Sequence, residues 1–303
     1  MIKLENTLYL TFTALILITF NISAAEVDPK IIACNAALNN QQYESAITKA
    51  NAAIKQKDLA AQGMMCKGRA LLALGKKEEA KAEFISADKS ASNDFDKTVA
   101  NLLLGNLEKE QKHYQEAIKL YETSLAFAKK DDNRNFTRVS YNLIGETYGL
   151  LNDHVTSLKY LEEGEKLAMN DNERADSFER IAANYQAQHQ FDQAIAYQIK
   201  GIAMQRKAGT LDQYAEANLT LGQLHTQNKD FVNAEATYAK LIQFSQENGG
   251  AYYEAKTLVY LAQAKQAQGD STAANQHFAE AEIIAKKIQA HDLSDLIKTA
   301  QQK

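Results

Sequence analysis

The chain has 303 residues, of which 45% are apolar and 24% are charged, so it is long and apolar enough to bury a sizeable core. A formal net charge of -4 and the lack of a basic stripe exclude the electrostatic signature of a nucleic-acid-binding protein. One proline, no tryptophan and few β-branched runs favour an all-helical chain.

The N-terminal segment has the features of a secretory signal peptide. A positive charge precedes an apolar run at 8–20, and the small residues Ser23 and Ala25 suit a cleavage site. The run is shorter than the roughly 20 residues that a transmembrane helix needs, which disfavours the alternative of an uncleaved membrane anchor. We therefore expect residues 1–25 to be a signal peptide and residues 26–303 to be an exported domain, periplasmic or secreted, that does not span the membrane.

Small residues recur in two columns along the rest of the chain. One column repeats at intervals of 34 to 40 residues, and the other lies twelve positions upstream of it. The downstream column is Ala46, Ala80, Ala117, Ser157, Ala194, Ala234 and Ala274, and the upstream column is Cys34, Gly68, Gly105, Gly145, Ala182, Gly222 and Ala262. Glycine inside a helix costs about 1 kcal/mol relative to alanine, so glycines at one repeat phase need a packing reason. Close contact between two helices supplies it.

Each pair of small residues belongs to a helical hairpin, because a short polar stretch such as "KEQKH" separates the two columns. Longer polar breaks such as "KKDDNRN" separate one hairpin from the next, and their Asp and Asn residues suit helix caps. A continuous coiled coil is disfavoured because the apolar pattern restarts after every break. The predicted hairpins are at about 27–60, 61–97, 98–137, 138–174, 175–214, 215–254 and 255–291, followed by a C-terminal capping helix.

These hairpins resemble tetratricopeptide repeats over essentially the whole mature chain. In that family, helix A carries an apolar, a small and an aromatic residue, and helix B carries an aromatic, a small and an aromatic residue. The first pattern is present as Ile144, Gly145 and Tyr148, and the second as Tyr114, Ala117 and Tyr121. The family's early tryptophan and late proline are absent, and the spacing is similar to that of extended bacterial repeats. The resemblance implies an all-α superhelix, or solenoid, of about seven hairpins with a concave groove lined mainly by the A helices.

The family's groove-facing positions, transferred to this chain, supply candidate binding residues. Amide side chains can pair with both the N–H and the C=O of an extended peptide, apolar side chains can receive its side chains, and Arg69 could hold a carboxylate. Glu146 and Glu179 would make the middle of the groove mildly acidic. The candidates are Asn35, Met65, Arg69, Leu102, Asn106, Asn142, Glu146, Glu179, Leu219 and Gln223. An ordinary hydrated groove is the alternative for each position.

No motif in the chain nominates a catalytic, cofactor or metal site. The six histidines fall at different repeat phases without forming H-E-x-x-H, and the 13 glycines form no phosphate loop or dinucleotide fingerprint. We therefore expect no enzyme, no cofactor and no metal. The predicted function is a scaffold or adaptor in the cell envelope that binds a protein or an extended peptide. A peptide or signal sensor that acts through a membrane partner is the alternative.

Cys34 and Cys66 are the only two cysteines. Both fall near the middle of neighbouring predicted A helices, and an exported protein meets an oxidising compartment. The sequence is compatible both with a disulfide and with two buried thiols, because the directions of the side chains decide between them.

Overall fold

The computed structural model describes residues 28–302, and within this range every regular element is a helix. The expected signal peptide at 1–25 lies outside the described residues. The helices are α1 Pro29–Asn39, α2 Tyr43–Ile54, the short 3-10 helix η1 Lys57–Leu59, α3 Ala60–Ala73, α4 Lys77–Ser90, α5 Asp94–Glu110, α6 Tyr114–Lys130, α7 Arg134–Leu150, α8 His154–Lys166, α9 Asp171–Ala187, α10 Phe191–Ala208, α11 Leu211–Gln227, α12 Phe231–Glu247, α13 Ala251–Gln268, α14 Ser271–Lys287 and α15 His291–Gln301.

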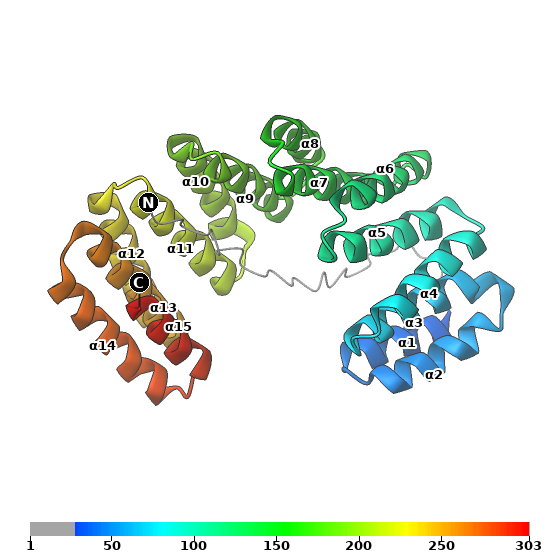
Figure 1. Ribbon diagram of the computed structural model, residues 1–303, viewed down its shortest axis with the longest axis horizontal. Helices are drawn as coiled ribbons and strands as arrows, with labels where there is room; N and C mark the ends of the chain where they lie inside the picture. The colour runs from blue at the N-terminus through cyan, green and yellow to red at the C-terminus, as the bar shows by residue number, and fades with distance from the viewer. Residues whose placement is uncertain (1–27, 303) are drawn as a thin grey trace.

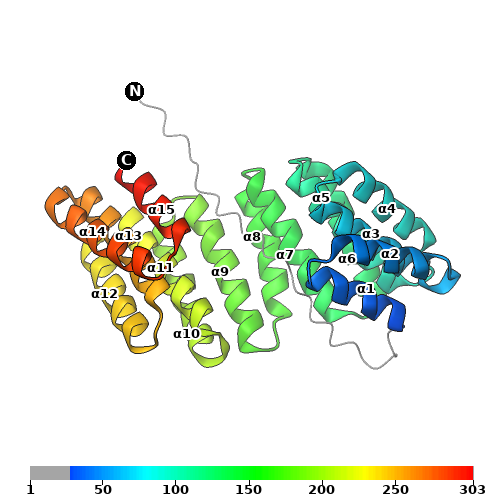
Figure 2. The same ribbon diagram turned by 90° about the horizontal axis from the view of Figure 1, so that it is seen from below.

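Successive helices pack in pairs, and the pairs stack into an open arc (Figure 1). In the middle of the arc, α5, α7 and α9 lie on the inner side and α6, α8 and α10 on the outer side. Figure 2, turned by 90°, shows the helices from α7 to α14 following one another along the stack. The predicted all-α superhelix of about seven hairpins is therefore confirmed.

Polar caps decide where several A helices begin. The side chains of Asn93, Asn133 and Asn170 accept hydrogen bonds from the first turns of α5, α7 and α9, and Thr210 forms a capping box at α11. Each of these caps lies upstream of the predicted repeat boundary. The predicted starts at 98, 138, 175 and 215 consequently fall inside helices that begin at 94, 134, 171 and 211. The predicted start at 255 also falls inside a helix, α13, which begins at 251 after Gly250.

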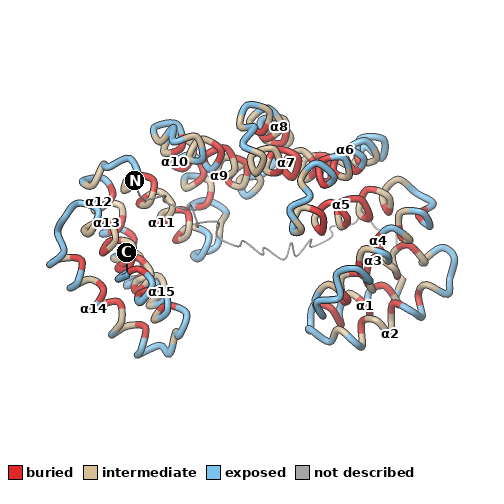
Figure 3. Tube along the Cα trace, in the orientation of Figure 1, coloured by how far each residue is buried: buried red, intermediate tan, exposed pale blue. Residues whose placement is uncertain are grey.

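A large side chain of helix B covers each glycine of the upstream column. A Cβ atom on Gly105 would lie 2.4 Å from Cε1 of Tyr121, and one on Gly222 would lie 2.3 Å from Cε1 of Tyr238. Phe84 covers Gly68 and Leu161 covers Gly145 in the same way. The tube in Figure 3 shows the buried residues concentrated where the two helices of each pair meet. The small column thus lets a large side chain of helix B fill the hairpin.

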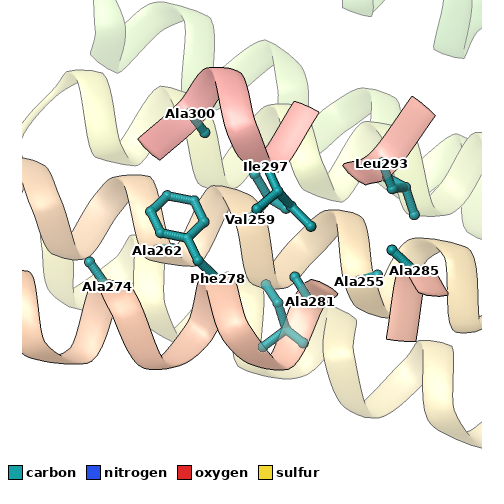
Figure 4. Close-up of a cluster of buried hydrophobic side chains, with 11 residues drawn as sticks. Ala255, Val259, Ala262, Ala274, Phe278, Ala281, Ala285, Leu293, Ile297 and Ala300 are labelled. Carbon is teal, nitrogen blue, oxygen red and sulfur yellow. The ribbon is translucent and has the colours of Figure 1, made fainter. Parts of the chain in front are cut away.

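The C-terminal helix α15 closes the last hairpin. Leu293, Ile297 and Ala300 pack with Phe278 and Val259 in a buried apolar cluster formed by α13, α14 and α15 (Figure 4). Without α15, this apolar surface of the terminal repeat would face water, which is the usual reason for a capping helix in a repeat protein. The predicted capping helix is therefore present.

Every hairpin turns through one residue in the left-handed backbone conformation. Two of these residues are glycines, Gly75 and Gly269, and the others carry side chains. The full set is Gln41, Gly75, Lys112, Asn152, His189, Lys229 and Gly269. A residue with a Cβ atom is strained in this conformation by roughly 1 to 2 kcal/mol, whereas glycine adopts it freely.

We expect Lys112→Gly, with φ of 65° at that position, to raise the free energy of unfolding by roughly 0.5 to 1 kcal/mol. The gain is smaller than the strain because glycine is also more flexible in the unfolded chain. Urea denaturation measures the change. The matched control is Lys119→Gly, an exposed lysine inside α6, which should cost about 1 kcal/mol. If both substitutions changed the free energy of unfolding in the same direction, the assignment of strain to the turn would be contradicted.

Candidate functional site

The inner face of the arc carries a series of polar contacts between neighbouring A helices. Each contact joins one A helix to the next through hydrogen-bonded side chains. They are Arg69 to Asn35 at 3.3 Å, Gln62 to Asp96 at 3.3 Å, Lys109 to Glu146 at 3.2 Å, Arg138 to Asp176 at 2.8 Å, Gln186 to Gln227 at 3.0 Å and Lys256 to Glu216 at 2.5 Å. The polar side chains that line this face therefore bond largely to one another and connect successive hairpins.

In the middle of the groove, three helices share a network of opposite charges. Lys109 of α5 donates to Glu146 of α7, which also pairs with Arg180 of α9. Arg180 continues to Asp176 at 2.8 Å, and Arg138 of α7 donates to the same carboxylate at 2.8 Å. Each carboxylate thus lies between two cations. The network ties α5, α7 and α9 together across two hairpin boundaries.

The surrounding protein shifts the pKa of several members of this network. Burial, helped by the positive charge of Arg180, lowers the pKa of Lys109 to about 8. Burial, helped by Arg138, lowers the pKa of Arg180 to about 10. Burial raises the pKa of Asp176 although the hydrogen bond from Arg138 opposes the rise. These side chains are held as partly dehydrated ions, which costs free energy unless each keeps its partners.

The prediction of a mildly acidic middle is wrong. Glu146 is neutralised by Lys109 and Arg180. Glu179 accepts a hydrogen bond from Gln205 at 3.2 Å, and burial, the largest effect, raises the pKa of its carboxyl group. The sequence contains both carboxylates, but the superhelical stacking that brings cations of other helices to them is not visible in it.

Four predicted groove residues lie in the core instead. Met65, Leu102 and Leu219 are only 6%, 4% and 2% exposed, so they offer a ligand almost no surface. Asn142 is also buried, and it donates to Asp176 at 3.3 Å. These four side chains therefore face the space between helices and not the groove. This corrects their assignment as ligand contacts.

The other candidates remain on the concave face and are partly exposed. Arg69 donates to Asn35, and burial lowers the pKa of its guanidinium group. Asn106 accepts a hydrogen bond of 2.8 Å from the hydroxyl of Tyr121, the residue that fills the third hairpin. Gln223 is partly exposed on α11. Asn35, Arg69 and Asn106 are thus held in defined orientations at the groove surface.

The sequence-based selection missed the tyrosines at the C-terminal end of the groove. Tyr252, Tyr253 and Tyr260 follow one another along α13, and Tyr252 donates to Asp292 of α15 at 2.7 Å. Burial and this carboxylate raise the pKa of Tyr252 to about 12. The recurrence of tyrosines along one A helix is the sequence feature that could have indicated them as candidates. Tyr253 and Tyr260 pack against an apolar cluster of α11 to α13, whereas Tyr252 is 37% exposed.

The two cysteines are joined by a disulfide between α1 and α3. Their Cα atoms are 6.5 Å apart, and both side chains are buried. The bridge links the first hairpin to the second on the side where Arg69 contacts Asn35. Of the two alternatives left open by the sequence, the structure has the bridged one.

Within residues 28–302, no group of three or more histidine, cysteine, aspartate or glutamate side chains could hold a metal ion. Over the same range, no helix combines the length and the apolar character that crossing a membrane requires.

We expect acid to destabilise the protein through Glu173, next to the central network. Hydrogen bonds from Arg134, aided by the backbone N–H of Met169, lower the pKa of Glu173 to about 2 against the opposing effect of burial. A lowered folded-state pKa adds stability above the unfolded value of about 4.3, and this stability is lost as the pH falls toward 2. Raised pKa values at Asp176 and Glu179 act in the opposite sense, since their protonation relieves burial.

Urea unfolding between pH 7 and pH 2 tests this expectation. Glu173→Gln should remove part of the loss of stability below about pH 4. Glu79→Gln, which changes an exposed side chain of α4, is the control and should leave the acid profile as it is. An unchanged profile in Glu173→Gln would show that Arg134 does not stabilise the ionised carboxylate.

The comparisons with known proteins agree with this geometry. Two models of the tetratricopeptide repeat family match residues 34–94 and 98–170. No curated protein matches the chain in sequence at a significant level. The family predicted from the small columns and aromatic positions is therefore confirmed.

Solved structures share the fold at low sequence identity. A signal transduction ATPase with a tetratricopeptide repeat sensor, from Pyrococcus horikoshii, aligns with a TM-score of 0.72 at 15% identity over 89% of this chain and 44% of its own. The apo form of RapI aligns at 0.68 and 14% over 89% and 84%. A chain of the APC/C hetero-tetramer Cut9–Hcn1 aligns at 0.59 and 16% over 91% and 49%.

This chain spans about half the length of two of these three proteins, and identities this low establish the fold alone. Family matches over the first four hairpins and the same hairpin architecture through α14 lead to one conclusion. The chain is a tetratricopeptide repeat protein.

Proposed function

We propose that this protein is an exported, non-catalytic scaffold whose concave face binds an extended segment of another protein in the cell envelope. The observation that carries the proposal is the inner face itself, an open surface of ordered polar and aromatic side chains along successive A helices. Repeat proteins of this kind use such concave surfaces for protein interaction. Export is proposed from the charge, apolar run and small residues of the N-terminal segment.

The two ends of the groove are the best places for ligand contacts. In the middle, Glu146 and Asp176 are already shared by two cations each, so a ligand there would have to replace existing ion pairs. Near the N-terminal end, Arg69 combines a charge with the amide of Asn35. Near the C-terminal end, Tyr252 is partly exposed. An extended peptide can place apolar side chains on such rings and its backbone against the amides.

Site-specific photocrosslinking in cells tests the proposal. An extended segment that contacts both ends of the groove must pass α9, so a photoreactive amino acid at Ala183, an exposed position on that helix, should give a discrete protein adduct in the envelope fraction. The same amino acid at Val155, which is 82% exposed on the outer helix α8, is the control and should give none. Arg69→Ala should weaken the Ala183 adduct. Equal labelling from both positions, or an adduct only from α8, would contradict binding in the groove.

The alternative function is a peptide or signal sensor that acts through a membrane partner. The sensor description of the Pyrococcus horikoshii protein favours considering it, although the shared property is the fold. Short peptides alone should raise the melting temperature of a sensor, whereas a scaffold should need the folded partner. Amino-terminal sequencing of the envelope form should begin near residue 26 if the signal peptide is cleaved, and an intact N-terminus would contradict export by this route.

A further inference from the structure

The fifth hairpin, α9 and α10, differs from the others in the side chain that fills it. Sixteen residues after each small residue of helix A, helix B carries Phe84, Tyr121, Leu161, Tyr238 or Phe278 in the neighbouring hairpins. In the fifth hairpin the corresponding residue is Gln198, which follows Ala182. Gln198 is only 2% exposed, so a polar side chain occupies the position that an apolar or aromatic side chain fills elsewhere.

The polar character continues along the same interface. The Nε2 of Gln198 donates to the backbone carbonyl of Ala217 in α11 at 2.9 Å. Two turns further along α10, Gln205 is also buried and donates to Glu179, while its own carbonyl oxygen is buried without a hydrogen-bond partner. Buried polar groups that are incompletely satisfied weaken packing. At Gln198 and Gln205, α10 therefore contacts α11 and α9 through buried hydrogen bonds, whereas other hairpins have apolar side chains at the position of Gln198.

The large apolar clusters of the protein lie on either side of this hairpin. Four buried clusters lie between Cys34 and Ile144, with partly buried contacts extending to Tyr160, and two more lie between Ala215 and Ala300. None of these six clusters includes a residue between 161 and 214. Within the fifth hairpin, the ring of Tyr197 stacks on Tyr185 at 5.6 Å and lies 6.2 Å from Phe178.

The fifth hairpin, residues 171–208, has one large apolar side chain that is completely buried, Ile181 at 1% exposure. Its buried small residues are Ala175, Ala182, Ala194 and Gly201, which allow α9 and α10 to approach closely. Each such residue removes little apolar surface from water, and local stability follows buried apolar contact. The lowest free energy of opening among the internal hairpins is therefore expected here.

From these observations we propose that α9 and α10 form a polar joint between two apolar blocks, α1–α8 and α11–α15. Movement at this joint changes the separation of the two ends of the groove, near Arg69 and near Tyr252. The groove can therefore widen or narrow around a bound segment without disrupting either apolar block. The joint is a property of the free protein and does not depend on the proposed function.

Hydrogen exchange of the full chain tests the joint directly. Amides of α9 and α10 should exchange faster than those of α5 and α6. Gln198→Leu, which restores an apolar side chain at the filling position, should slow exchange in α9 and α10 by roughly tenfold or more. Leu161→Gln is the matched control, because it places glutamine at the same position of the fourth hairpin. It should speed exchange in α7 and α8.

A distance measurement tests the motion itself. Spin labels at the exposed residues Lys89 of α4 and Lys240 of α12 report the separation of the two blocks. A broad distance distribution is expected for the native chain and a narrower one for Gln198→Leu, with Gln198→Met as a second variant if leucine impairs folding. Equal protection of α9–α10 and α5–α6, or a narrow distribution that the variants leave unchanged, would overturn the proposal.

Discussion

Replacing Gly105 with alanine is expected to lower the free energy of unfolding by about 1 to 3 kcal/mol, the usual cost of overfilling a packed core. The new methyl group would lie 2.4 Å from Cε1 and 2.7 Å from Cδ1 of Tyr121. The ring cannot simply turn aside, because Tyr121 is fully buried and its hydroxyl donates to Asn106. Helices α5 and α6 must therefore move apart, and the orientation of Asn106 at the groove should change with them.

Gly149→Ala is the matched control for Gly105→Ala. Gly149 also lies in an A helix, α7, but a Cβ atom there would meet only the hydroxyl of Ser157, at 3.4 Å. Alanine should be neutral at this position or stabilise the helix by up to about 1 kcal/mol. Thermal and urea unfolding of the two variants measure the difference. Equal stabilities would show that contact with Tyr121 does not explain the glycine at 105.

The hairpins could be predicted from the sequence because each is specified by local patterns. The small columns mark the two helices, and residues such as Asn133 and Asn170 mark where helices begin. The boundaries differ by a few residues because the repeat phase follows the columns, whereas the helix begins at its cap. Turn residues such as Lys112 and His189 carry no glycine signal, so their left-handed conformation is visible only in the structure.

The groove could be predicted only in part, because it depends on how one hairpin is placed on the next. Lys109 and Glu146 are 37 residues apart, and Arg138 and Asp176 are 38 apart. These pairs meet only because the superhelical stacking places the A helices side by side. The same stacking buries Met65, Leu102 and Leu219 between hairpins. Sequence spacing identified which residues share one face of a helix. Only the structure shows whether a residue on that face points into the groove or packs against the next hairpin.

The bridge between Cys34 and Cys66 is expected to contribute roughly 3 to 4 kcal/mol to the stability of the N-terminal hairpins, because it closes a loop of 32 residues in the unfolded chain. Cys34 lies in a cluster with Ala46 and Ala50 of α2, so the bridge fixes a hairpin whose core is built mostly from alanines. Alanine side chains bury little apolar surface, and among the described residues the first hairpin packs against the second hairpin alone. Loss of the bridge should therefore lower the local stability of the N-terminal hairpins before that of the rest of the protein.

Non-reducing mass spectrometry should find no free thiol in the native protein. Reduction should speed hydrogen exchange in α1, α2 and α3 while leaving α13, α14 and α15 unchanged, because each repeat contacts only its neighbours. The double variant Cys34→Ala with Cys66→Ala should show the same local loss and no further response to reductant. Two free thiols in the native protein would contradict the disulfide. Equal hydrogen exchange in oxidised and reduced chains would contradict its contribution to stability. A change in exchange confined to α1–α3 would also show that loss of the bridge has little effect beyond the second hairpin. The N-terminal end of the groove, with Asn35 and Arg69, could then loosen while the central ion pairs stay intact.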